Sequence, residues 1–484
     1  MNFSTRLILP RHLPNRVTIP KPGVALNLDR TPTINTAIAL AFLSMSFTSC
    51  AAEVVSPSNT AITAPIGGSN QVAPFQYIPG EKWKDLDPSE VIKRSGEPLR
   101  VAELYKAGNY AETGTAGLAL ISKEKVDEQL QLYIANSLAW TNRLKEAGQL
   151  YRVLVDGKYK MSAMLGLANL NRWQGRDHLS APLYRQILAS DPTNKDALEG
   201  LRLTDREMKP KTTVTLGGSN DSSDIQLRTL KINHRWRDPS GANTWEVETT
   251  RVRNNNLVTE VQRQDFAVRY KMLETPFKPR LELGTDGQKV YGNVGVELGP
   301  LPVWVDVGRV NWGLSSNNPA ALAANLSATR LGVQAATSLA AGSLFGRADF
   351  YNISDGNTIT TSALRFTPAW RPLGSHFKPL LGIETRNAKY NTLNYWSPSD
   401  GYGSATAGVM GEWGESDWNF FASAQVGARL FGEAGRSWSL SSGGKRWLNK
   451  DWAVGMNFWA MGSQRDNLPY RARSLYFTVE KLWP

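Results

Sequence analysis

Residues Trp418 to Leu430 read WNFFASAQVGARL, and this stretch carries the pattern that decides the fold. Every second residue from Trp418 to Leu430 is apolar, and the residues between them include Gln425 and Arg429. An alternation of period two is typical of a β-strand with one face in apolar surroundings and the other in water. The length is near the ~10 residues that a tilted strand needs to cross a bilayer.

The same alternation recurs from Lys211 to Trp483, where turn signals separate about sixteen short segments. Two further examples are Val294, Val296 and Leu298 between Asn293, Gly295 and Glu297, and Phe266, Val268 and Tyr270 between Asp265, Ala267 and Arg269. The mean hydropathy of −0.35 excludes a bundle of membrane helices but suits a barrel, whose strands average lipid-facing and lumen-facing residues. We therefore expect residues 211–484 to form a transmembrane antiparallel β-barrel of about sixteen strands.

Connection lengths separate a membrane barrel from a soluble β-sandwich, which also alternates. Membrane barrels have short periplasmic turns and longer outer loops, and an even strand count brings both ends to the periplasm. The short connections predicted here are Gly299–Pro302, Gly414–Asp417 and Leu448–Asp451, and the long ones are Asn311–Ser327, Asn387–Gly403 and Gln464–Ala472. This asymmetry favours the membrane barrel.

Tryptophan supports the same conclusion, because thirteen of the sixteen Trp residues fall in this half of the chain. An amphipathic ring is most stable at the level of the lipid headgroups, so a rim rich in Trp indicates an interfacial girdle. Eight Trp lie where strands meet the short-turn side: Trp236, Trp245, Trp370, Trp413, Trp418, Trp447, Trp452 and Trp483.

Charged residues within the strands are expected to line a water-filled interior. An Arg that faces lipid near the midplane would cost roughly 2–4 kcal/mol, whereas a barrel of ~16 strands leaves an aqueous lumen. Aromatic rings stack on pyranose faces and polar groups bond hydroxyls, so this mixture suits a sugar polymer, although a general porin lining has the same composition. The candidate pore-lining residues are Arg269, Glu297, Trp304, Asp306, Arg347, Asp349, Tyr351, Glu384, Arg386, Phe421 and Arg429.

Residues 1–52 are predicted to be a signal peptide. The apolar run Ile38–Phe47 (IALAFLSMSF) follows a basic leader and is too short to span a membrane. Two interpretations of the cleavage site stay open: a lipoprotein box in which Cys50 is lipidated, or cleavage after Ala51 or Ala52 with Cys50 discarded. Residues 53–93 are rich in Ser, Thr, Pro, Gly and Ala and are predicted to be a flexible linker.

Residues 94–207 have helical periodicity with a repeating unit. Gly108, Asn142 and Gly175 recur at spacings of 34 and 33 residues, and Tyr151 and Tyr184 occupy matching places in the last two copies. Gly and Asn tolerate the positive φ that a tight interhelical turn requires. The pattern resembles the tetratricopeptide repeat (TPR), and about three copies are the minimum for a stable array. An ordinary helical bundle is the alternative.

Several function classes are excluded by what the sequence carries. The net charge of +12 is spread along the chain without a dense basic block, so no nucleic-acid partner is expected. Cys50 is the single Cys, and His12, His178, His234 and His376 are scattered, so neither a metal site nor a cofactor is expected. Catalysis needs a nucleophile beside a positioned base. No Ser-His motif accompanies His234 or His376 within the barrel, and we do not expect an enzyme.

One motif carries a family resemblance. The segment Tyr395-Trp396-Ser397-Pro398, followed by Tyr402 and the strand GSATAGVMGEW, resembles the Tyr-Phe-Ser-Pro segment of the outer-membrane exopolysaccharide export proteins. That group comprises the cellulose synthase operon protein C family and the poly-N-acetylglucosamine export porin. The closing SLYFTVEKLW is similar to the end of that family as well. The resemblance covers about the last ninety residues, and the rest of the chain is similar in architecture alone.

The resemblance implies an outer-membrane porin, with its TPRs in the periplasm, that exports a cellulose-like or poly-N-acetylglucosamine-like polysaccharide. The implied partners are the polysaccharide chain, membrane lipids, the barrel assembly machinery, and periplasmic or inner-membrane synthase components that bind the TPRs. The chain departs from the family in having about three repeats instead of a long array. Two alternatives stay open: a factor that exports surface lipoproteins or other proteins, and a structural or receptor barrel without a transport role.

Overall fold

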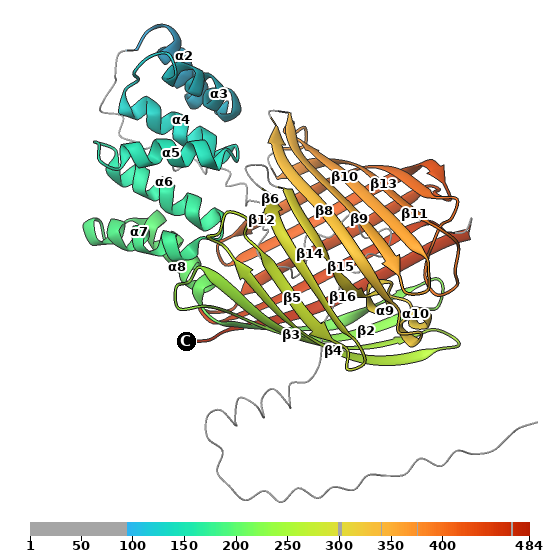
Figure 1. Ribbon diagram of the computed structural model, residues 1–484. Helices are drawn as coiled ribbons and strands as arrows, with labels where there is room; N and C mark the ends of the chain where they lie inside the picture. The colour runs from blue at the N-terminus through green and yellow to red at the C-terminus, as the bar shows by residue number, and fades with distance from the viewer. Residues whose placement is uncertain (1–93, 299–302, 340, 375, 466–467) are drawn as a thin grey trace, which may run out of the picture. The chain divides into compact units, whose positions relative to one another are not determined.

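The computed structural model describes residues 94–484 except 299–302, 340, 375 and 466–467. The expected signal peptide (residues 1–52, with Cys50) and linker (residues 53–93) lie outside the described residues. The described chain forms a helical region followed by a closed barrel of sixteen antiparallel strands (Figure 1), which confirms the predicted fold class. No helix among the described residues is long and apolar enough to span a membrane.

The helical region contains consecutive short helices that pack mainly on their neighbours in sequence. Side-chain caps begin two of them: Asp127 accepts a hydrogen bond from the backbone N–H of Leu130 (2.9 Å), and Asn194 accepts one from that of Ala197 (3.0 Å). Such caps satisfy N–H groups that have no partner within the helix. The helices are α2 (Gly96–Lys106), α3 (Tyr110–Ile121), α4 (Glu128–Trp140), α5 (Leu144–Leu154), α6 (Lys160–Trp173), α7 (Asp177–Ser190) and α8 (Lys195–Met208).

The three recurring turn residues adopt the backbone conformation that their spacing predicted. Gly108, Asn142 and Gly175 have φ values of 79°, 64° and 72°. Each lies between two helices and turns the chain back, at a place where a β-branched residue would be strained.

A second repeated feature is a buried hydrogen bond between Tyr and Asn. Tyr151 Oη donates to Asn136 Oδ1, and Tyr184 Oη donates to Asn169 Oδ1, both at 2.7 Å. Each pair is shifted by 33 residues from the other. The local units are therefore equivalent in packing as well as in turn position, although their assignment to the TPR class stays a prediction.

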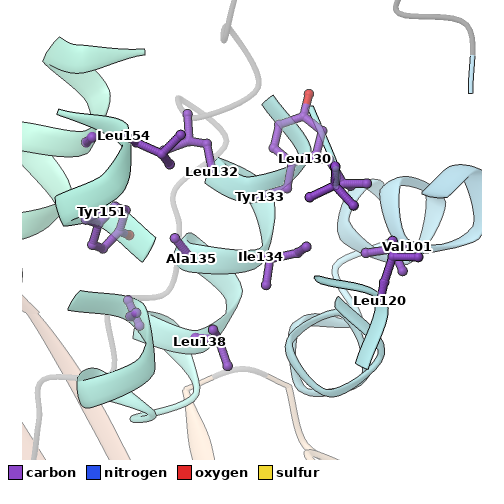
Figure 2. Packing of buried hydrophobic residues seen from close by; sticks show 14 of the residues in the cluster. Val101, Leu120, Leu130, Leu132, Tyr133, Ile134, Ala135, Leu138, Tyr151 and Leu154 are labelled. Carbon is purple, nitrogen blue, oxygen red and sulfur yellow. The ribbon is translucent and has the colours of Figure 1, made fainter. Parts of the chain in front are cut away.

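The core of the helical region is a continuous apolar cluster (Figure 2). Leu130, Ile134 and Leu138 of α4 are completely buried and lie at helical spacing along one face. Tyr151 and Leu154 of α5 pack on the same cluster, and Val101 and Leu120 join it from the preceding helices. A smaller cluster joins α6, α7 and α8.

The barrel closes because its last strand pairs with its first. The register between these two strands runs from Lys211↔Leu482 to Asp221↔Ala472 without a break. All the remaining pairs of neighbouring strands are consecutive in sequence. The strands are β1 (Lys211–Asp221), β2 (Gln226–Arg237), β3 (Asn243–Asn255), β4 (Glu260–Met272), β5 (Arg280–Thr285), β6 (Val290–Leu298), β7 (Val303–Asn311), β8 (Ser327–Leu339), β9 (Gly342–Ile353), β10 (Thr358–Pro368), β11 (Phe377–Ala388), β12 (Tyr402–Glu415), β13 (Trp418–Gly432), β14 (Ser437–Trp447), β15 (Trp452–Arg465) and β16 (Leu468–Leu482). Two short helices, α9 (Trp312–Ser315) and α10 (Pro319–Ala323), lie between β7 and β8.

Most of the predicted connections match the structure. The long ones fall between Asn311 and Ser327 and between Ala388 and Tyr402, and short turns join β12 to β13 and β14 to β15. The predicted turn Gly299–Pro302 lies outside the described residues. We call the end of the barrel with the long connections the loop end, and the opposite end, where β1 begins, the short-turn end.

The long loop predicted over Gln464–Ala472 is wrong. β15 continues to Arg465, β16 begins at Leu468, and these two residues are paired. At the loop end of β16 the outward-facing residues include Arg471 and Arg473, which are polar and exposed, while backbone pairing continues. Loss of the apolar alternation therefore does not mark the end of a strand there.

Candidate channel interior

The two faces of the barrel wall differ in chemistry. Outward-facing Leu283 and Val426 are 63% and 65% exposed, whereas inward-facing Glu248 and Asp349 are 0% and 2% exposed. In a closed wall, side chains that point inward are shielded by the strands around them. The outer face is therefore apolar and the inner face polar and ionised, as the alternation in the sequence predicted.

Ion pairs between neighbouring strands organise one side of the inner face. Arg269 of β4 binds Glu246 and Glu248 of β3 at 2.6 and 3.1 Å, and Glu282 of β5 at 3.0 Å. Lys231 of β2 binds Glu248 at 2.7 Å. Arg269 is held by carboxylates from the two strands beside its own, which neutralises its charge and fixes its side chain against the wall.

A second group of ion pairs lies on β7, β8 and β9. Arg330 binds Asp306 at 2.9 Å and Asp349 at 2.7 Å, and Arg347 binds Asp349 at 2.7 Å. Arg330 was not among the candidates from the sequence. A Thr before it and a Leu after it made its strand look like an ordinary alternating segment.

The predicted pore-lining residues fall into two groups. The first ten lie in strand positions with the register of the inner face: Arg269, Glu297, Trp304, Asp306, Arg347, Asp349, Tyr351, Glu384, Arg386 and Phe421. Arg429 lies beyond the last β13–β14 pair, Gly427↔Ser437, and its side chain is exposed. The structure thus brings the ten together on one surface, and their pore-lining role stays a prediction.

The segment with α9 and α10 folds inward at the loop end. Trp312 packs on Tyr351 of β9 and on Tyr395 of the β11–β12 loop, with ring centroids 4.9 and 5.4 Å apart. Leu314 and Leu322 of the same segment join a cluster with inward-facing Leu227 of β2 and Val252 of β3. These contacts lie on both sides of β7, so the segment extends across the interior at this end.

Hydrogen bonds hold this segment in place. Asn311 Nδ2 donates to Asp286 Oδ2 (2.8 Å), and Asn325 Nδ2 donates to Gln288 Oε1 (2.7 Å), both in the β5–β6 turn. Lys289 Nζ donates to the carbonyl oxygen of Asn325 at 2.5 Å. Neither α9 nor α10 is amphipathic over enough residues to reveal this placement from sequence.

The family-like motif shapes the β11–β12 loop. Tyr395 Oη donates to Asp355 Oδ2 (2.7 Å), and the Ser397 hydroxyl accepts from the backbone N–H of Thr392 (2.8 Å). The Pro398 carbonyl accepts from the N–H of Ala388 at 3.0 Å and thereby fastens the loop to the end of β11. Tyr395 and Ser397 are 2% and 4% exposed, so the motif folds the loop back on itself.

Trp396 of the same motif lies among inward-facing cations. The guanidinium carbons of Arg386 and Arg465 are 5.3 and 4.9 Å from the centre of its ring, both within cation–π range. Arg386 also donates to the Trp396 carbonyl oxygen at 3.0 Å, and Tyr402 lies edge-on to the indole at 5.1 Å. Sequence reasoning missed Arg465 because it fell in the segment expected to be a loop.

At the short-turn end, α8 contributes a carboxylate to the inner face. Glu207 accepts from Arg235 of β2 at 2.7 Å and lies 3.8 Å from the Lys211 ammonium of β1. Burial alone would raise the pKa of Glu207, but Lys211 and Arg235 hold that pKa far below its ordinary value. Glu207 is therefore ionised throughout the physiological range.

Other contacts at this end involve α7 and α8. Asp177 binds Arg237 at 2.5 Å, and burial raises the pKa of the Asp177 carboxyl to about 6 against the attraction of that guanidinium. Arg206 stacks on Trp447 at 4.4 Å and binds Asp417 at 2.8 Å. A cavity of ≈ 410 Å³ lies beside these residues and is lined by Arg202, Asp205, Arg206, Lys209, Asp417, Trp447, Leu448, Asn449 and Lys450.

Aromatic rings form rows on the outer face near the short-turn end. Trp236 of β2, Trp245 of β3 and Tyr270 of β4 contact one another in sequence, with centroids 6.4 and 4.4 Å apart. A second row joins Phe377, Trp413 and Phe420, at 5.6 and 5.7 Å. Trp447, in contrast, has the register of the inner face and contacts Arg206.

Among the described residues, no group of three or more His, Cys, Asp or Glu side chains could hold a metal ion. His234 hydrogen-bonds the Thr212 hydroxyl at 2.8 Å, and His376 Nδ1 lies 3.1 Å from the carbonyl oxygen of Glu412.

No family model matches the sequence, and a search of curated proteins finds no match. Solved structures with a similar fold include a bacterial polysaccharide outer membrane secretin (10% identity, TM-score 0.45, covering 57% of this chain and 99% of that one). CdiB from Acinetobacter baumannii aligns at 10% identity with a TM-score of 0.36, over 56% of this chain and 60% of that one. OccK11 (OpdR) from Pseudomonas aeruginosa aligns at 10% identity with a TM-score of 0.33, over 57% of this chain and 96% of that one. The TM-scores of these three structures are all below 0.5.

Proposed function

We propose that this protein is an outer-membrane channel that exports an exopolysaccharide from the periplasm to the cell surface. The observation that carries the proposal is the closed barrel with an apolar outer face and an ionised, aromatic inner face. A closed barrel leaves no unpaired strand edge, which is the condition for strands to cross a bilayer. The polar interior then offers a path for a hydrophilic solute.

The outer face supports the membrane location. The rows Trp236–Trp245–Tyr270 and Phe377–Trp413–Phe420 place aromatic rings at one rim, where headgroups meet the acyl chains. The short-turn end, from which α8 leads into β1, would then face the periplasm with the helical repeats. In that position the repeats serve as a docking platform for periplasmic or inner-membrane synthase components.

The inner face supports a saccharide as the cargo. It combines ion pairs, which offer many polar contacts, with inward-facing Trp304, Tyr351 and Phe421, whose rings suit the apolar faces of pyranoses. Cellulose-like and poly-N-acetylglucosamine-like polymers are the cargoes that the family resemblance implies. Insertion would depend on the barrel assembly machinery, as for other barrels with this type of last strand.

Export of a lipoprotein or another protein is the second candidate function. An exporter that releases its cargo sideways needs a seam that opens between two strands. The β1–β16 seam is paired along its full length, and Trp483 adds a further bond from its backbone N–H to the Pro210 carbonyl oxygen at 2.9 Å. This closed seam favours transport along the interior over lateral release.

Deletion of the gene tests the proposal. We expect loss of surface polysaccharide, measured by dye binding and biofilm formation, while polymer accumulates in the periplasm because synthesis continues. A plasmid copy should restore surface polymer. Unchanged dye binding and biofilm in the deletion strain would contradict export, and loss of a surface lipoprotein instead would favour the second candidate.

A further inference from the structure

The loop end of the barrel interior contains buried hydrogen-bond donors without acceptors. They are Nε of Arg386 and the indole Nε1 atoms of Trp396 and Trp312. Buried polar groups are bonded in the large majority of cases, so several unmet donors in one region need an explanation. Trp312 lies edge-on to Tyr395, the residue before Trp396 in the β11–β12 loop.

Arg386 also differs from Arg269 and Arg330, two other arginines of the inner face. Arg269 and Arg330 each bind two or more carboxylates. Arg386 is 4% exposed, and its one hydrogen bond to a described residue goes to the carbonyl oxygen of Trp396. A buried guanidinium without a carboxylate is costly, and a second cation, Arg465, lies against the same indole ring.

These features define the ligand by its chemistry. The three unmet groups of this cluster are donors, and one of them belongs to a guanidinium without a carboxylate, so the missing partner is an acceptor with negative charge. A carboxylate accepts two parallel hydrogen bonds from a guanidinium, whereas a hydroxyl group offers no charge.

We propose that Arg386 and Trp396 form a binding site for the carboxylate of an acidic saccharide at the loop end of the channel. The inference rests on the proposed function and narrows its cargo to a polysaccharide that carries acidic groups. A cellulose-like backbone with acidic substituents fits this site. A polymer of cationic amino sugars does not, because the Arg386 guanidinium would repel it.

The experiment measures saccharide binding to the full chain in detergent by tryptophan fluorescence and calorimetry. The probes are an oligoglucuronate, cellohexaose as the neutral analogue, and inorganic phosphate as a free anion. We expect the oligoglucuronate to bind more tightly than cellohexaose, and phosphate at equal concentration to displace little of it. Arg386→Gln should weaken oligoglucuronate binding about tenfold or more, as expected for loss of a charge-assisted hydrogen bond, and leave cellohexaose unaffected.

Two further variants separate binding from folding. Arg251→Gln removes an Arg whose exposed side chain hydrogen-bonds Gln262 on the outer face, and it should leave all binding unchanged. Arg386→Lys retains the charge without the bidentate geometry and should give an intermediate loss. Each variant is checked for folding by its mobility on gels before and after boiling.

Two results would overturn the site. Equal binding of cellohexaose and oligoglucuronate, unchanged by Arg386→Gln, would mean that water satisfies the donors. Displacement by phosphate as effective as that by the oligosaccharide would mean a free-anion site. Neither result depends on the deletion phenotype, so failure of the site and failure of the export proposal are distinguishable.

Discussion

Two helical glycines show how the packing of single residues decides the stability of the repeat. A Cβ on Gly166 of α6 would lie 2.5 Å from the Tyr151 ring, whereas a Cβ on Gly148 of α5 would meet no atom closer than 3.7 Å. Gly200 of α8 has the same relation to Tyr184, at 2.3 Å. In both units the buried Tyr that donates to Asn therefore requires a glycine in the next helix.

Gly166→Ala should destabilise the helical region by roughly 1–3 kcal/mol, because the methyl group must displace a buried ring. Gly148→Ala, the matched control, should be neutral or stabilise by up to about 1 kcal/mol through helix propensity. Urea unfolding of the detergent-solubilised full chain, followed by the helical circular dichroism signal, measures both. Equal effects of the two substitutions would contradict the assigned packing.

Asp127 gives the helical region a dependence on pH. Burial acts to raise the pKa of its carboxyl, but hydrogen bonds from Arg94 and the Leu130 N–H outweigh this, and the pKa lies below its ordinary value. A lowered folded-state pKa means that the stabilisation is present above the unfolded-state pKa, near ~3.9, and is lost as pH falls through the folded-state pKa. Asp127→Ala should therefore cost about 1 kcal/mol at pH 7, the usual value of an N-cap.

The same comparison at pH 3 completes the test. The difference in unfolding free energy between wild type and Asp127→Ala should shrink there, because the wild-type carboxyl is becoming protonated. Asp196→Ala, which removes an exposed acid in the first turn of α8, serves as the control and should change little. A difference that stays constant with pH would rule out the charged cap.

At the scale of elements, the segment with α9 and α10 has the largest consequence. It places apolar side chains against inward-facing residues of β2, β3 and β9. A segment that crosses the interior at this end limits the size of the solute that can pass through the barrel.

Replacing residues 313–325 with a short Gly-Ser turn should raise single-channel conductance several-fold in planar bilayers, because it removes the segment that crosses the interior. The β7–β8 pairing lies outside the replaced residues. The register from Val303↔Ala335 to Asn311↔Ser327 should survive the replacement. A milder change, Leu322→Ser, should raise the frequency of open events by weakening the contact with the β2–β3 wall. Conductance unchanged by both alterations would show that the segment does not restrict the channel.

The sequence predicted elements with local signals and missed those that depend on distant contacts. The alternation in Trp418–Leu430 and the positive-φ positions of Gly108, Asn142 and Gly175 are local, and both are found in the structure. The inward fold of α9 and α10 depends on Leu227 and Val252, more than sixty residues away in sequence, and no local pattern marks it. Arg386 and Trp396 were both predicted as candidate residues from the sequence. Arg465, which contacts the same indole, was not, because the polar sequence of the β15–β16 hairpin resembled a loop.

At the scale of the whole molecule, the apolar outer face determines how the protein behaves in solution. Residues such as Leu230, Leu283 and Phe477 expose 40%, 63% and 51% of their surface, and they recur around the barrel. Exposed apolar area of this extent is unstable in water unless lipid or detergent covers it.

We expect the purified chain to need detergent and to migrate faster on gels when it is not boiled, because the closed barrel stays compact. The comparison of boiled and unboiled samples measures this directly. A protein that remains monomeric without detergent and migrates identically in both lanes would contradict the membrane barrel.

The pairing of β16 with both β15 and β1 has a consequence for biogenesis. The barrel cannot close until the fifteen residues of β16, Leu468–Leu482, have been made, so the earlier strands must be kept from pairing with other chains during transit. A stop codon at the start of β16 would remove the pairing partner of both β15 and β1. Such an allele should behave as a complete loss of the gene, and its product should be degraded before it reaches a bilayer.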